Sequence, residues 1–254
     1  MALAPNGDLV IGAQLDGTVD FGGGPLTSTF GEDIAIARLS ADGDHVASIA
    51  FGTAEFDWLH SLDVGPNDQI IIGAERLENF MGSDFVAAYD ADLTGELWHH
   101  DYAIGEPQVA VHANGDISVV GLGLAMRRLD ANGNELSAAL FDAGVFGIAN
   151  LNVAASGDGG LWVLGTAQGT VDLGGGPMTV DGDGDAMVAL YDAAWNPVFS
   201  EVYPGGIWAD TSAIAPIDPQ TAVITGLFED GLTVCPTPLV PVLAMDGFVA
   251  KLAL

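Results

Sequence analysis

Five segments of the chain repeat one pattern, in which a polar turn leads into a short apolar strand that ends in glycine. The glycines are Gly12, Gly73, Gly121, Gly165 and Gly226, and they lie 61, 48, 44 and 61 residues apart. The turns before the first three contain Asn-Gly-Asp or Asn-Asp, as in Asn6–Gly12. Repetition at this period is typical of proteins built from stacked copies of one supersecondary unit.

Each glycine-ended strand is followed by further strand signals. Second strands are expected at Asp33–Leu39, Asp84–Tyr89, Leu124–Leu129, Asp185–Tyr191 and Asp246–Leu252. Third strands are expected at 46–51, 96–102, 135–141 and 198–203, and fourth strands at 58–64, 108–111, 148–154 and 211–215. Asp42-Gly43 and Asn132-Gly133 suit two-residue hairpins. No segment shows an apolar period of 3.6 residues over a helical length, so helices are not expected.

The sequence therefore predicts an all-β fold, namely a β-propeller of about five blades with up to four antiparallel strands each. We expect one domain over residues 1–254, with repeat units at 5–64, 65–111, 112–155, 156–217 and 218–254 plus 1–4. The last blade is either completed by the N-terminal strand or left incomplete. An open β-solenoid and a fragment of a longer array are the alternatives.

The charge balance excludes several classes of partner. The chain carries 35 Asp and Glu against 5 Lys and Arg, a formal net charge of −30. Binding to nucleic acid or to an anionic membrane surface depends on Lys and Arg, so neither is expected. The lone Cys235 cannot form a disulfide within the chain or complete a cysteine-ligated zinc site. No run of 18 apolar residues predicts membrane insertion.

The repeat also carries a resemblance to a known family. Asp84–Asp90 and Asp246–Leu252, together with the Asn-Gly-Asp turn, resemble the bacterial β-propeller repeat family of SBBP type. Gly17–Thr27 is similar to an insertion common in such repeats from myxobacteria, and it recurs at Gly169–Thr179. The resemblance implies a secreted or envelope-associated scaffold without catalytic residues. We therefore expect an extracellular or cell-envelope location, with any export signal absent from this chain.

Asp181, Asp183 and Asp185 are the best candidates for a metal site. They alternate with glycines, and carboxylates spaced in this way can converge on calcium. The spacing does not fit an EF-hand, because Ala186 and Asp192 stand where glycine and a bidentate glutamate belong. A plain polar turn is the alternative, and no other cofactor is expected.

No arrangement of residues predicts catalysis. Asp8, Asp68, Asp116 and Asp158 recur in nearly every unit, which indicates turn residues of the repeat. The triple glycines at 22–24 and 174–176 lack a lysine and a following helix, so they are interpreted as turns and not as phosphate loops.

These observations favour a non-enzymatic scaffold that presents loops for binding a protein or a glycan. The unequal connections at 13–32, 166–184 and 229–245 are the candidate binding loops. A glycosidase or lyase with carboxylates in the propeller channel is one alternative, which predicts two neighbouring acids and aromatic sugar platforms. A purely structural repeat module is the other. The oligomeric state is not indicated.

Overall fold

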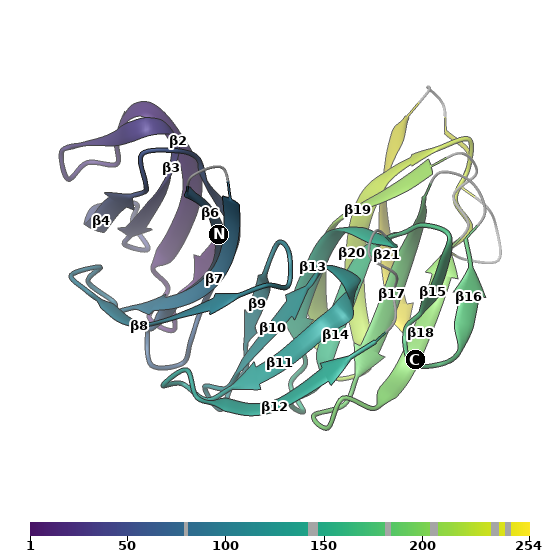
Figure 1. Cartoon of the computed structure of the whole chain (residues 1–254). Helices are drawn as coiled ribbons and strands as arrows, with labels where there is room; N and C mark the ends of the chain where they lie inside the picture. The colour runs from purple at the N-terminus through teal and green to yellow at the C-terminus, as the bar shows by residue number, and fades with distance from the viewer. Residues whose placement is uncertain (79–80, 142–146, 181–183, 204–207, 235–238, 242–244) are drawn as a thin grey trace. The chain divides into compact units, whose positions relative to one another are not determined.

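Apolar strands joined by polar turns make up most of the part of the chain that a computed structural model describes (Figure 1). The structure describes residues 1–78, 81–141, 147–180, 184–203, 208–234, 239–241 and 245–254. Within these ranges there is no α-helix, and one 3₁₀ turn spans Leu122–Leu124. No helix in this part of the chain is long and apolar enough to span a membrane. The predicted all-β class and its antiparallel hairpins are confirmed.

The chain groups into two compact units, which are described separately. The first unit contains residues 1–120 and 127–137, and the second contains residues 121–126 and 138–254. The single domain over residues 1–254 stays a prediction.

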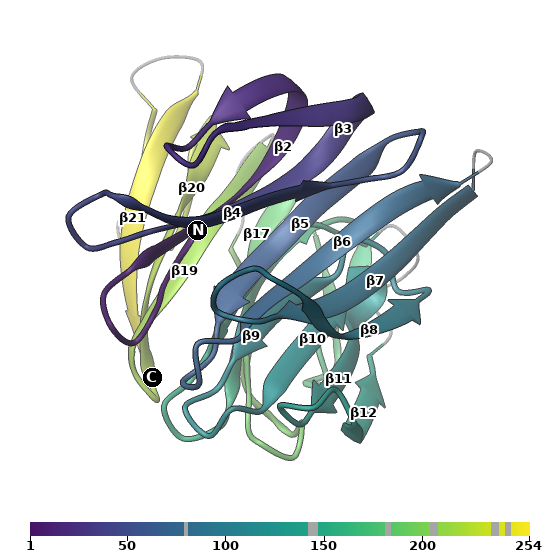
Figure 2. The same ribbon diagram turned by 90° about the vertical axis from the view of Figure 1, so that its left-hand side faces the viewer.

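The first unit is built from four-stranded antiparallel sheets whose strands follow chain order. The first sheet consists of β1 (Ala2–Leu3), β2 (Leu9–Asp20), β3 (Pro25–Leu39) and β4 (His45–Phe51). The second sheet consists of β5 (Asp57–Val64), β6 (Ile70–Glu78), β7 (Met81–Tyr89) and β8 (Glu96–Tyr102), which lie side by side in Figure 2. A third sheet consists of β9 (Gln108–Val111), β10 (Ile117–Gly121), β11 (Ala125–Leu129) and β12 (Glu135–Leu140). Its residues 121, 125, 126 and 138–140 belong to the second unit.

The second unit repeats the same construction. One sheet has the order β13 (Ile148–Ala155), β14 (Leu161–Ala167), β17 (Asp185–Tyr191) and β18 (Pro197–Tyr203). A small two-stranded sheet pairs β15 (Thr170–Asp172) with β16 (Pro177–Thr179). The last sheet has β19 (Trp208–Asp218), β20 (Thr221–Glu229) and β21 (Asp246–Ala253), three strands among the described residues.

The strands were predicted well, but their grouping into units was offset by one strand. The expected fourth strand at 58–64 is β5, the first strand of the second sheet, and the strands at 108–111, 148–154 and 211–215 likewise begin the next sheet. The expectation that residues 1–4 complete the last blade is wrong, because β1 pairs with β2 (Ala2 with Val10).

Apolar runs in the strands are explained by burial on both faces of the sheets. In the first unit, Val10, Ile34 and Ile36 of the first sheet form one core with Ile70, Ile72 and Phe85 of the second. In the second unit, Trp162, Leu164 and Val188 form one core with Ile224, Phe228 and Phe248 of the last sheet. Each sheet thus hides apolar surface that it could not bury alone.

The expectation that the repeated glycines end their strands is wrong except at Gly121, because the other four lie inside β2, β6, β14 and β20. Close approach explains why glycine recurs at these positions. A Cβ on Gly73 would lie 2.1 Å from the carbonyl oxygen of Pro107, and a Cβ on Gly226 would lie 2.1 Å from that of Asp210. A Cβ on Gly12 would meet Leu59 of the second sheet at 2.3 Å. The repeat therefore keeps glycine because neighbouring strands leave no room for a side chain.

The predicted loop at 13–32 is wrong in extent, because β2 and β3 continue as one long hairpin (Figure 1). The loop at 166–184 likewise contains β15 and β16. The triple glycines occupy the tips, as predicted. Asp20 Oδ1 accepts hydrogen bonds from the amides of Gly22 and Gly24, and Asp172 Oδ1 accepts them from Gly174 and Gly176. The stretch 229–245 is described only in part and contains a bridge between Leu232 and Leu239.

Candidate functional site

Three aromatic side chains gather on the first unit from separate segments of the chain. Phe30 lies in β3, Phe56 lies in the connection between β4 and β5, and Trp58 lies in β5. The rings of Phe56 and Trp58 stack with centroids 6.0 Å apart and planes 6° from parallel. Phe30 meets Phe56 edge to face at 6.3 Å. We call Phe30, Phe56 and Trp58 the aromatic platform.

The two phenylalanines of the aromatic platform are exposed, Trp58 is half-buried, and the rings are held in place. Phe30 is 59% exposed and Phe56 is 41% exposed, and because their rings touch they form one apolar patch instead of two scattered side chains. The indole Nε1–H of Trp58 donates to Glu32 Oε2 over 2.9 Å, which fixes the ring against β3. Gly31 has a φ of +62°, and a Cβ there would lie 2.9 Å from the Phe56 ring. Glycine at this position therefore lets the Phe56 ring approach β3.

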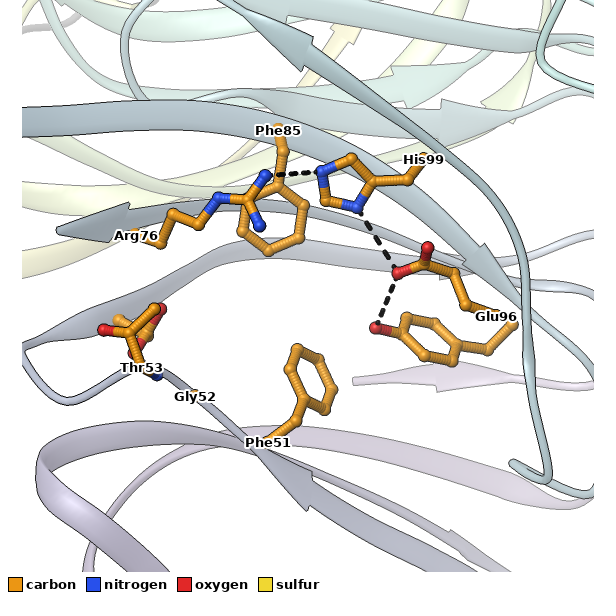
Figure 3. Close-up of a pocket in the computed structure, with 9 residues that line it drawn as sticks. Phe51, Gly52, Thr53, Arg76, Phe85, Glu96 and His99 are labelled. Atoms are coloured by element: carbon orange, nitrogen blue, oxygen red, sulfur yellow. Dashed lines mark hydrogen bonds and ion pairs between the residues drawn. The ribbon is translucent and has the colours of Figure 1, made fainter. Parts of the chain in front are cut away.

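A cavity of about 370 Å³ lies in the same unit, between the end of β4 and the strands β5 to β8 (Figure 3). Its lining combines apolar rings with charged groups. The lining residues are Phe51, Gly52, Thr53, Asp57, Arg76, Phe85, Tyr89, Glu96 and His99. The rings of Phe51 and Tyr89 stack at 5.4 Å, so the first and second sheets meet at one edge of the cavity.

One chain of polar contacts crosses this cavity (Figure 3). Arg76 Nη2 lies 2.8 Å from His99 Nε2 and 2.6 Å from Asp101 Oδ1. His99 Nδ1 lies 3.3 Å from Glu96 Oε2, which also accepts from the Tyr89 hydroxyl at 3.4 Å. His99 Nε2 also lies 3.3 Å from Asp101 Oδ1, so each nitrogen of the ring has a carboxylate beside it.

The protonation of the cavity groups follows from these contacts. The hydrogen bond from Arg76 lowers the pKa of Asp101. Burial raises the pKa of Tyr89, and the neighbouring Glu96 carboxylate adds to the effect. Burial also raises the pKa of Asp57, which begins β5. The cavity thus contains a cation, a neutral phenol and a carboxyl whose charged form is disfavoured.

Of the residues predicted to hold calcium, Asp181 and Asp183 lie outside the described residues. Asp185 is the first residue of β17, is buried, and pairs in register with Ala167. The calcium site stays a prediction. In the described part of the chain, no three or more His, Cys, Asp or Glu side chains are grouped to hold a metal ion. Cys235 also lies outside the described residues.

The four recurring aspartates lie in turns, as predicted. Asp8 and Asn6 bond each other, since the Asp8 amide donates to Asn6 Oδ1 and Asn6 Nδ2 donates to Asp8 Oδ2. Asn114 and Asp116 form the same pair of bonds. Asp158 accepts from the amide of Gly160, and Asp68 has a positive φ of 63°.

Sequence reasoning missed the aromatic platform and the cavity, because their residues are scattered over several segments. One signal was available. Phe56 and Trp58 are two residues apart next to a predicted strand, and side chains at that spacing share a face.

Comparisons with known proteins give only distant similarities. No protein-family model matches the chain, and no curated protein matches it. Among solved structures, a Bacteroides caccae protein of unknown function has 11% identity and a TM-score of 0.47, with 76% of this chain and 66% of that chain covered. BamB from Moraxella catarrhalis has 12% identity and a TM-score of 0.49, with 87% and 60% covered. A puromycin hydrolase structure has 14% identity and a TM-score of 0.40, with 90% and 33% covered. The chain spans less than the full length of each of these proteins.

Proposed function

We propose that this protein is a non-enzymatic scaffold of β-propeller type that binds a glycan through the aromatic platform. The platform is the observation that carries the proposal. Aromatic rings in contact at the surface offer flat apolar faces at little cost in conformational entropy, and a carboxylate beside them accepts hydrogen bonds. Pyranose rings present one apolar face and a rim of hydroxyl groups, which matches both features.

The surroundings favour a glycan over other occupants. Stacked aromatics also bind bases, but a net charge of −30 opposes any polyphosphate chain. Glu32 holds Trp58 and keeps acceptor capacity for a sugar hydroxyl.

The proposed architecture explains why the platform lies where it does. Repeated four-stranded sheets form a rigid frame, and the elongated β2–β3 hairpin carries Phe30 on one of the segments predicted to bind. We also propose an extracellular or cell-envelope location, where glycans are accessible. The resemblance to exported bacterial repeats and the acidic composition support this location.

The test is binding of the full chain to a panel of neutral oligosaccharides, followed by isothermal titration calorimetry on any that bind. We expect Phe30→Ala and Phe56→Ala to weaken binding by roughly tenfold or more, because each removes an exposed stacking surface. Leu140→Ala is the matched control, since Leu140 is also exposed and apolar but lies on β12.

Three outcomes would contradict the proposal. Absence of glycan binding would favour a purely structural module. Binding that persists unchanged in both phenylalanine variants would place the site elsewhere. Cleavage of the bound oligosaccharide would favour the glycosidase or lyase alternative.

A further inference from the structure

Two buried carboxylates face each other across Gly52 in the first unit. Asp33 lies in β3 and is 1% exposed, and Asp57 begins β5 and is 3% exposed. A Cβ on Gly52 would lie 2.5 Å from Asp33 Oδ1 and 2.9 Å from Asp57 Oδ2. Glycine at position 52 therefore lets the two carboxylates converge on one small space. We call Asp33 and Asp57 the acid pair.

One oxygen of the acid pair has no partner. Asp33 Oδ2 accepts from the amide of Thr29 at 2.7 Å, and Asp57 Oδ2 accepts from the amide of Thr53 at 2.6 Å. Asp33 Oδ1 is buried and makes no hydrogen bond within the described ranges of the chain. Buried polar atoms are almost always satisfied, and an unsatisfied one points to a bound ion or water.

The acid pair departs from the repeat that surrounds it. Asp84 occupies the position in the second sheet that Asp33 occupies in the first, and its Oδ2 accepts from the amides of Ile104 and Gly105. After β4, the Thr53 amide donates to Asp57 and the Glu55 amide donates to the Thr53 hydroxyl. In the first sheet, the Thr53 amide after β4 therefore donates to Asp57. Among the described residues, Asp33 Oδ1 is left without a donor, whereas Asp84 in the second sheet accepts from two amides after β8.

The negative charge of the acid pair favours binding of a cation. Both side chains are buried, so water does little to offset their charges. Arg76 lines the same cavity as Asp57, but its guanidinium already donates to His99 and Asp101. Two carboxylates in a buried space repel each other unless a cation or a proton lies between them.

We propose that the acid pair binds a calcium ion, at a site separate from residues 181–185. Calcium takes six to eight oxygen ligands and accepts carboxylates, backbone carbonyls and water together. Asp33 Oδ1 and Asp57 supply the anionic ligands, and carbonyls and water complete the shell. The ion would join the first sheet to the second, because each sheet contributes one carboxylate.

The test compares the full chain with Asp33→Asn and Asp57→Asn after treatment with EDTA, in buffer with physiological salt. Calcium chloride alone is the probe, and calorimetry and the thermal midpoint are the readouts. We expect calcium to raise the midpoint of the unchanged protein with increasing concentration. Each variant should weaken binding by roughly tenfold or more, since each removes an anionic ligand. Asp84→Asn is the matched control and should bind as the unchanged protein does.

The variants should fold without calcium, because each replaces a buried charge with a neutral isostere; far-ultraviolet circular dichroism checks this. The proposal is overturned if calcium leaves the unchanged protein unaffected, or if both asparagine variants retain its affinity. It is also overturned if acid alone relieves the repulsion and calcium adds no stability at any pH, since the pair would then share a proton.

Discussion

Arg38 Nε donates to Asp8 Oδ2 over 2.8 Å, in the interior of the first unit. The same guanidinium reaches Asp68 Oδ1 at 3.3 Å and the carbonyl of Ala91 at 3.3 Å. Asp8 belongs to the turn before β2, whereas Asp68 and Ala91 belong to turns of the second sheet. One buried arginine therefore joins the first two sheets by contacts with three turns. Two of these contacts are with aspartates that recur in the turns of the repeat.

We expect Arg38→Met to lower the thermal midpoint by several degrees. Methionine retains much of the apolar stem, but it leaves Asp8 without its cationic partner and the Ala91 carbonyl without a donor. Thermal unfolding followed by circular dichroism measures the effect. Arg127→Met is the control, because Arg127 pairs with Glu135 at the surface, where such pairs contribute little. Equal losses in the two variants would show that the buried contact has no special role.

The repeat glycines give a second prediction. Gly73→Ala and Gly226→Ala should each cost about 1–3 kcal/mol or more of unfolding free energy, because the new Cβ would overlap a backbone oxygen that cannot rotate away. Denaturant unfolding measures the loss. Gly157→Ala is the matched control, since no atom lies within 4 Å of its Cβ position. If all three variants unfold alike, close approach does not explain the repeat.

The sequence predicts individual strands far better than their grouping. The expected strands 96–102 and 108–111 coincide with β8 and β9. The strands that begin each new sheet were assigned to the wrong unit. For example, β4 and β5 are joined by residues 52–56, and β5 and β6 by residues 65–69, which are connections of equal length. Local turn chemistry thus gives no reason to attach β5 to one neighbour or the other, and tertiary packing decides.

The long β2–β3 hairpin and the acid pair were missed for different reasons. Glycines around Asp20 read as loop residues, although Thr18 and Thr27 pair across the hairpin through their hydroxyls at 2.9 Å. Asp33 was interpreted as a repeat residue, and nothing local distinguishes it from Asp84. The difference appears only once Asp57 folds beside it, a contact between separate sheets.

Acid should selectively weaken the turns that are capped by aspartate. The side chain of Asn196 and the backbone of the same turn lower the pKa of Asp192. A carboxyl group whose pKa is lower in the folded protein than in the unfolded chain stabilises the folded state at pH values above its unfolded pKa, near 3.8. This stabilisation is lost as the pH falls through the pKa of the folded protein. Asp192→Ala should therefore lower the midpoint at neutral pH, and the difference from the unchanged protein should shrink well below pH 3.8. Thermal melts across this range measure it, and a constant difference would contradict the assignment.

Asp20 and Asp172 allow one prediction about turn stability to be tested at two places in the chain. Each carboxylate accepts two glycine amides at the tip of a Gly-Gly-Gly-Pro turn, at 2.7 and 3.0 Å for Asp20 and at 2.8 and 3.0 Å for Asp172. Asp20→Ala should speed amide hydrogen exchange at Gly22 and Gly24 while leaving the thermal midpoint nearly unchanged, because the tip is exposed and opens locally. Asp20→Asn should retain most of the protection, since its side-chain oxygen still accepts. Asp172→Ala should act in the same way on Gly174 and Gly176 and leave the first turn unaffected. Faster exchange along the whole of β2 in Asp20→Ala would instead mean that the turn holds the hairpin together, and that the paired backbone beyond Asp16 cannot persist without it.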